Sequence, residues 1–200
     1  GRCDLAFAAY SQGKVSEATE TMDGVAKEAS SGSESAKKAQ LLTAMIAFLT
    51  NGENSDSASL NAKAILQLDP GNLVAQMVEA KLQLVGGAAT QAESSYQGIL
   101  ERHPDFALVK RELAALYASD ATKLDAAETL AMKAREGLPD DTGLARILAE
   151  ISFQKEDFDY ANALLREISG KETLDARGLY FLGMSHLKLG ELTKATGLLE

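Results

Sequence analysis

"LYFLGMSHLKLGELTKATGLLE", residues 179–200, has the pattern of two short amphipathic helices joined at Gly190. Its first half places Leu179, Leu182, His186 and Leu189 at intervals of three and four residues, which is the spacing of one buried helix face. Gly183 stands in the middle of that helix, where glycine costs about 1 kcal/mol relative to alanine. A glycine at this position is expected only if close packing with another helix offsets the cost, and the rest of the sequence indicates such packing.

Small side chains recur along the chain in a repeat of about 34 residues. Going back from the C-terminus, the first series consists of Ala195, Ala161, Ala127, Ala92 and Ala58. A proline follows three of these alanines at one constant spacing, at Pro70, Pro104 and Pro139. A second series of small residues precedes the alanines at a spacing that differs by one position in a single repeat, at Gly183, Ala149, Ala114 and Ala80.

The two series of small residues fall on the first and second helix of each predicted pair. Two helices of a hairpin approach closely only where both lack bulky side chains at the crossing. Gly183 is therefore predicted to be a packing glycine on the first helix, with Ala195 as its counterpart on the second.

A period of about 34 residues with these marks resembles the tetratricopeptide repeat (TPR) family. The best match is "LGMSHLKLGELTKA", through Leu182, Gly183, His186, Gly190 and Ala195. Two further segments match, "GGAATQAESSYQGILERHP" through Gly87, Ala92, Tyr96 and Pro104, and "LAFAAYSQGKVSEATETM" through Leu5, Ala6, Gly13, Ala18 and Met22. The sequence departs from the pattern at Ile46, where a small residue is expected, and at Thr173, in a proline place.

The resemblance implies an all-α fold, a right-handed α-solenoid of about six TPR-like helix-turn-helix repeats in one domain over residues 1–200. The repeats are expected at 1–32, 37–72, 73–106, 107–141, 142–175 and 176–200, the last truncated, with a flexible Ser/Gly-rich linker at 29–36. First helices are expected at 3–12, 37–50, 72–85, 106–119, 142–154 and 174–188. Second helices are expected at 15–28, 56–68, 89–102, 123–136, 158–169 and from 191 onward.

The end of the chain leads to a further expectation. The last helix stops soon after Ala195, without the polar capping element that a repeat array needs. We therefore expect this chain to be a fragment of a longer array.

Composition and charge exclude several classes of partner. The net charge is −9 and the isoelectric point about 4.8, which argues against a nucleic-acid partner and against anionic membranes. The longest apolar stretch, residues 41–49, is shorter than the roughly 20 residues that cross a bilayer. We expect no nucleic acid and no membrane insertion by this segment.

No residue pattern indicates catalysis, a metal site or a cofactor, and we expect that the chain is not an enzyme. Cys3 is the only cysteine, and the two histidines lie far apart in the sequence, so no metal-ligand spacing exists. His103 precedes a proline in a predicted turn, where exposure is expected. His186 lies on the buried helix face and is interpreted as a hydrogen-bonded core residue.

By the resemblance, the second, fifth, ninth and twelfth places of each repeat line a concave groove for a partner. The candidate groove residues are Met77, Lys81, Leu84, Arg111, Arg146, Glu150, Phe153, Arg177, Tyr180 and Met184. Their basic members suggest a ladder that suits a peptide or helix carrying some acidic residues. The alternative interpretation is that these arginines only pair with neighbouring acidic side chains.

These features predict a protein–protein interaction scaffold that binds a peptide or helix of a partner protein, as part of a larger assembly. A structural spacer or self-assembling array, or the regulatory arm of a larger protein, are the alternatives. The partner's identity, the oligomeric state and the compartment, cytoplasmic or bacterial periplasmic and envelope-associated, stay open at this stage.

Overall fold

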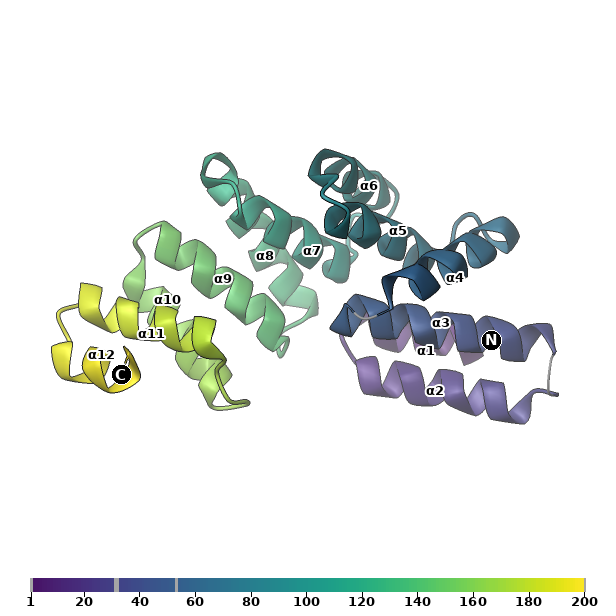
Figure 1. Ribbon diagram of the computed structural model, residues 1–200, viewed down its shortest axis with the longest axis horizontal. Coiled ribbons are helices and arrows are strands. Elements are labelled where there is room, and N and C mark those ends of the chain that lie inside the picture. The colour runs from purple at the N-terminus through teal and green to yellow at the C-terminus, as the bar shows by residue number, and fades with distance from the viewer. Residues whose placement is uncertain (1, 31–32, 53, 200) are drawn as a thin grey trace. The chain divides into compact units, whose positions relative to one another are not determined.

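The computed structural model describes residues 2–30, 33–52 and 54–199 (Figure 1). The regular structure of these residues is entirely helical, with twelve α-helices and one short 3-10 helix. The helices are α1 (Arg2–Ser11), α2 (Val15–Glu28), α3 (Glu34–Asn51), α4 (Ser55–Leu68), α5 (Leu73–Val85), α6 (Ala89–Arg102), α7 (Ala107–Ala118), η1 (Ala121–Lys123), α8 (Leu124–Gly137), α9 (Thr142–Gln154), α10 (Phe158–Ser169), α11 (Ala176–Lys188) and α12 (Leu192–Leu199).

The chain divides into two compact units. Unit 1 covers residues 1–109, with α1–α6 and the start of α7, and unit 2 covers residues 110–200, with the rest of α7 and α8–α12. In unit 1 each helix from α1 to α6 packs on the next, and α3 also contacts α5. In unit 2 the same order runs from α8 to α12, and α9 also contacts α11. Each unit is therefore a stack of helix hairpins in chain order.

The helix bounds confirm the sequence-based expectation to within about three residues at either end. Of the linker predicted at 29–36, residues 29–33 lie between α2 and α3, and its residues 31–32 are outside the described part of the chain. Residues 34–36 form the first turn of α3, so the prediction was wrong for them. The prediction that all repeats form one domain stays a prediction.

In five of the six helix pairs, the turn between the first and second helix contains a residue in the left-handed conformation. Four pairs have glycine there, with φ between 74° and 80°, at Gly13, Gly52, Gly87 and Gly190. At Gly87, the amide N–H bonds to Leu84 O, and the next amide bonds to Gln83 O, which ends the helix in a Schellman-type cap. The fifth pair makes the same two bonds with Glu156 in place of glycine, at φ 64°.

Side-chain caps fix where most of the later first helices begin. The carboxylate of Asp141 accepts from the Leu144 N–H of α9 at 2.7 Å, and that of Asp175 accepts from the Gly178 N–H of α11 at 2.8 Å. Asn72 caps α5 in the same manner, accepting from the Ala75 N–H at 3.1 Å. These side chains satisfy amide groups that the first turn of a helix leaves unbonded.

The small residues of both series are buried, which agrees with their predicted place at the helix crossings. Gly183 is buried in α11 and Ala195 of α12 is 2% exposed, and α11 and α12 pack on one another. The remaining members of both series are at most 2% exposed, namely Ala58, Ala80, Ala92, Ala114, Ala127, Ala149 and Ala161. Ile46 breaks the small-residue pattern and is still 1% exposed.

The prediction of a buried face on α11 is confirmed only for the residues in the middle of the helix. Leu182 and His186 are buried, whereas Leu179 and Leu189 are each 36% exposed. Leu179 stands in the first half of α11 and Leu189 is its C-cap residue. The prediction was wrong for these two leucines because the neighbouring helices cover the middle of α11 more fully than its ends.

Candidate functional site: the α9–α11 surface

Two of the predicted basic groove residues are bound to helix caps of the following repeat. Arg111 of α7 donates through Nη1 to the Asp141 carboxylate at 2.6 Å, and Arg146 of α9 donates to the Asp175 carboxylate at 2.7 Å. Asp141 and Asp175 are the N-cap residues of α9 and α11. An arginine in the first helix of one repeat thus anchors the start of the first helix in the next repeat.

Arg111 is the more deeply embedded of these two arginines. It also bonds to Glu112 at 2.7 Å, and the side chains of Arg111 and Asp141 are 21% and 14% exposed. Burial by itself lowers the pKa of Arg111, but the negative charges of Glu112 and Asp141 outweigh it, so the pKa is raised. Arg146 bonds in addition to Glu172 at 3.0 Å. Both arginines are therefore engaged within the protein and hold consecutive hairpins together.

The candidate groove residues of α5 lie in unit 1, and one of them was predicted wrongly. Met77 is 1% exposed, because both flanks of α5 are covered by α3, α4 and α6. It is a core residue and is inaccessible to a partner. Lys81 is half-buried and donates through Nζ to the Leu49 carbonyl, with its ammonium 5.9 Å from the centre of the Phe48 ring. Leu84 is half-buried.

The remaining candidates gather on adjoining faces of α9 and α11. Phe153 of α9 and Phe181 of α11 form an edge-to-face pair, with ring centroids 5.1 Å apart. Phe158, at the start of α10, packs on Phe153 at 5.4 Å, and Tyr180 packs on Phe181 at 5.6 Å. Phe153, Phe181 and Met184 are half-buried, whereas Tyr180 is 50% and Leu187 41% exposed. These rings form an aromatic cluster, and Tyr180 and Leu187 are the exposed side chains on the same helix face.

One ion pair also joins α9 and α11 next to this aromatic cluster. Arg177 of α11 donates through Nη2 to the Glu150 carboxylate of α9 at 2.8 Å, and its guanidinium lies 5.8 Å from the centre of the Phe181 ring. The Arg177 side chain is 67% exposed and the Glu150 side chain 16% exposed. Burial raises the pKa of Glu150, and the charges of Arg177 and Arg146 offset part of that increase. Arg177 is thus the member of the predicted ladder with most of its surface in solvent.

We define the α9–α11 surface by seven side chains that share these two helix faces. They are Glu150, Phe153, Arg177, Tyr180, Phe181, Met184 and Leu187. The five members on α11 are spaced by three or four residues or lie beside one another, so they form one stripe along that helix. Large apolar side chains collected with polar neighbours on an exposed face are typical of protein interaction sites.

Sequence reasoning did not select Phe181 or Phe158, although both shape this surface. The family pattern marks the second, fifth, ninth and twelfth places of a repeat, and Phe181 holds the sixth. A helical-face count from Arg177 would have found it, because residues four positions apart lie on the same face. Phe158 belongs to a second helix, and only the packing of α10 against α9 brings it to Phe153.

The two histidines lie as predicted. His103 is exposed beyond the end of α6. His186 is 6% exposed, with Asn162 Nδ2 3.0 Å from its ring nitrogen Nδ1 and the Glu191 carboxylate beside that nitrogen. This polar group joins α10, α11 and the start of α12, so its role is to hold the last hairpin.

The described part of the chain contains neither a group of metal-ligating side chains nor a helix that could span a membrane. Across residues 2–30, 33–52 and 54–199, no three His, Cys, Asp or Glu side chains lie close enough together to hold a metal ion. In the same part of the chain, no helix combines the length and apolar content needed to cross a membrane.

Comparison with solved structures places the fold. No protein-family model and no curated protein matches this sequence. A thermophilic TPR protein from Thermus thermophilus is 18% identical, with a TM-score of 0.63 over 80% of this chain and 87% of that chain. PilF of Pseudomonas aeruginosa is 14% identical, with a TM-score of 0.63 over 98% and 86%. A TPR protein from Parabacteroides merdae is 14% identical, with a TM-score of 0.57 over 98% and 75%.

Helix hairpins stacked in chain order on small residues define the class of α-helical repeat proteins. Within that class, this chain has the tetratricopeptide repeat fold, an all-α solenoid architecture of TPR-like repeats. The resemblance stated from the sequence is confirmed at the level of the fold.

Proposed function

We propose that this chain is a protein-interaction scaffold that holds a segment of a partner protein against the α9–α11 surface. The observation that carries the proposal is the apolar group of Phe153, Tyr180, Phe181, Met184 and Leu187, of which Tyr180 and Leu187 remain 50% and 41% exposed. Leaving two large apolar side chains in water forgoes the stabilisation of about 25 cal/mol per Å² that burying them would give. A partner segment that covers these two side chains would regain that stabilisation.

The chemistry of the surface describes the segment that fits it. A large apolar or aromatic side chain of the partner would pack on Tyr180 and Leu187, with Met184 adapting to its shape. An acidic side chain would reach Arg177, whose guanidinium is exposed and whose own partner Glu150 lies in the surface. Arg111 and Arg146 have no part in this recognition, because intramolecular carboxylates hold them.

The test selects peptides from a random library against the full chain and measures the affinity of the tightest one for point variants. We expect Tyr180→Ala to weaken binding tenfold or more, the usual effect of removing a central aromatic anchor. Arg177→Gln should weaken a peptide that carries an acidic residue. Leu192→Ala is the matched control, since Leu192 is 62% exposed on α12 and lies outside the α9–α11 surface. It should leave the affinity within twofold.

Two results would contradict the proposal. One is a peptide whose affinity is the same for the wild type and for Tyr180→Ala. The other is self-association: if light scattering shows that the chain alone oligomerises and that Tyr180→Ala abolishes this, the surface joins copies of the chain, and the self-assembling array is the correct account.

A further inference from the structure

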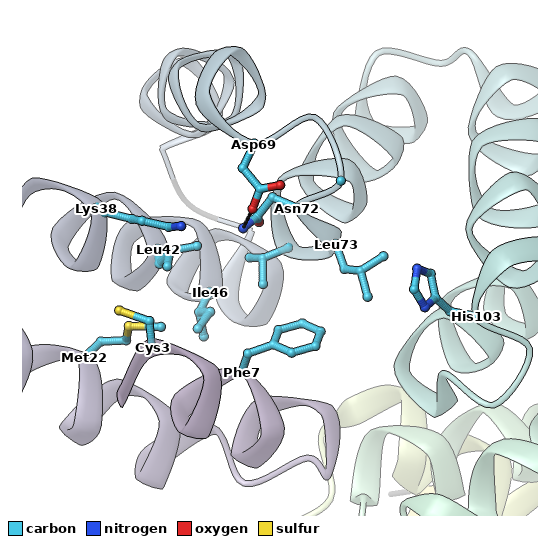
Figure 2. A pocket seen from close by; sticks show the side chains of 12 residues that line it. Cys3, Phe7, Met22, Lys38, Leu42, Ile46, Asp69, Asn72, Leu73 and His103 are labelled. Carbon is cyan, nitrogen blue, oxygen red and sulfur yellow. Dashed lines mark hydrogen bonds between the residues drawn. The ribbon is translucent and has the colours of Figure 1, made fainter. Parts of the chain in front are cut away.

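A second candidate site lies in unit 1, in a cavity of about 260 Å³ between α1, α2, α3 and the turn that leads into α5. Figure 2 shows the side chains that line it. Its deep wall consists of buried apolar side chains, contributed by Met22, Leu42, Ile46 and Val74. Phe7, Cys3 and Leu73 complete the apolar lining and are partly exposed.

The size of the cavity is sufficient for a small organic molecule. An apolar cavity of about 150 Å³ inside a protein binds benzene. The cavity in unit 1 is larger, at about 260 Å³, and is partly open to solvent. An aromatic ring or a chain of several methylene groups, together with a short polar end, fits such a space.

The mouth of the cavity carries polar groups, which differ in the hydrogen bonds and ion pairs that they form within the protein. Asn72 caps α5 by accepting from the Ala75 N–H at 3.1 Å, and it also donates to the Asp69 carboxylate at 3.4 Å. Lys38 forms no ion pair with any carboxylate whose side chain the structure describes. In Figure 2 its side chain runs along α3 towards the Asp69–Asn72 pair, with the ammonium at the edge of the cavity.

We propose that this cavity binds a small carboxylic acid with an aryl or short alkyl tail. The tail packs against Phe7, Leu42 and Ile46, which removes apolar surface of both molecules from water. The carboxylate meets the ammonium of Lys38 at the mouth and remains partly hydrated there. Asp69 lies on the same side of the mouth as Lys38 (Figure 2), and its carboxylate accepts from the Asn72 amide at 3.4 Å. This site belongs to unit 1 and is independent of the function proposed for the α9–α11 surface.

The test titrates the full chain with octanoate and with 4-phenylbutyrate, each paired with its neutral alcohol, 1-octanol or 4-phenyl-1-butanol, by calorimetry. We expect at least one acid to bind saturably in a 1:1 ratio and more tightly than the alcohol of the same tail. Lys38→Gln should reduce the affinity of that acid about fivefold to tenfold, because one charge-assisted contact at a partly hydrated site is lost. Its affinity for the alcohol should not change. Lys37→Gln is the matched control, since Lys37 directly precedes Lys38 on α3 and is exposed.

Cys3 provides a second readout of where the acid binds. It is the chain's only cysteine and lines the cavity, so an occupant should slow its alkylation by iodoacetamide. Binding with no change in the alkylation rate would place the acid elsewhere and overturn the proposal. So would equal affinities for acid and alcohol, equal losses in Lys38→Gln and Lys37→Gln, or no saturable binding of either acid.

Discussion

Glu156 occupies a backbone conformation that four of the equivalent turns give to glycine. Its φ is 64°, in the left-handed region, where a side chain costs roughly 1–2 kcal/mol that glycine does not incur. The side chain is exposed, so no packing depends on it.

We predict that Glu156→Gly raises the free energy of unfolding by about 0.5 to 1 kcal/mol, after the greater flexibility of glycine in the unfolded chain is subtracted. Urea unfolding followed by circular dichroism measures this. Glu156→Ala is the control and should bring no gain, because alanine keeps the Cβ atom. A stabilisation as large in the alanine variant would show that the side chain's charge, rather than its backbone conformation, is the cause.

Asp175 links stability to pH through its role as N-cap of α11. The backbone bond from Gly178 lowers the pKa of Asp175 most, followed by the charge and hydrogen bond of Arg146. A carboxyl group whose pKa is lower in the folded state stabilises the fold above its unfolded pKa of about 3.8, and this stabilisation is lost as the pH falls through the folded-state pKa.

We therefore expect wild type to melt at a higher temperature than Asp175→Asn at pH 7, and the difference to shrink as the pH falls below about 3.8. Asparagine remains a good cap, so the change removes mainly the charge. Thermal melts of both chains from strongly acidic to neutral pH provide the comparison. A difference that stays constant through this range would exclude ionised Asp175 as the source.

The acidic partners of Arg111 and Arg146 could be predicted from the sequence only in part. The sequence showed that Arg111 and Arg146 stand at equivalent places, and the alternative interpretation held that they pair with acidic neighbours. It could not show that the partners include Asp141 and Asp175, which belong to the start of the following first helix. That depends on how one hairpin stacks on the next, which no local pattern contains.

At the scale of the helix, the crossings of small residues determine how closely two helices pack. Ala127 of α8 is fully buried, whereas Ala126, its neighbour on the same helix, is exposed. The two alanines have the same helix propensity, so they separate the effect of packing from that of helix formation.

We predict that Ala127→Leu destabilises the protein by about 2 kcal/mol or more, because added volume at a filled crossing forces neighbouring side chains and backbone apart. Ala126→Leu should change the free energy of unfolding by less than about 0.5 kcal/mol. Chemical denaturation of both variants gives the two values. Equal effects would mean that the alanine repeat reflects composition rather than close packing.

The positions of the helices could be predicted from the sequence because the repeat marks both helices of each pair. The regular period of small residues, together with glycines at the turns, placed both helices of each pair. Met77, Leu179 and Leu189 were placed wrongly because exposure depends on the neighbours that cover each helix. α5 is covered on both flanks, and α11 is less covered at its ends.

At the scale of the whole molecule, the sequence predicted the architecture and the non-local contacts determined the candidate site. The α9–α11 surface combines residues that the repeat pattern marks, such as Tyr180 and Met184, with Phe181, which it does not mark. Phe158 of α10, also unmarked, packs on Phe153 of this surface. The cavity of unit 1 could not be anticipated, because it arises from side chains of several helices that fail to fill the space between them.

Hydroxyl-radical footprinting tests the claim that a partner segment binds to the α9–α11 surface. The full chain is oxidised with and without the selected peptide, and side-chain oxidation is read by mass spectrometry. We predict protection of Tyr180, Met184 and Leu187 when the peptide is bound. Met132, which is 47% exposed on α8, should be oxidised equally in both samples. Unchanged oxidation of Tyr180 and Met184 with saturating peptide would contradict the claim.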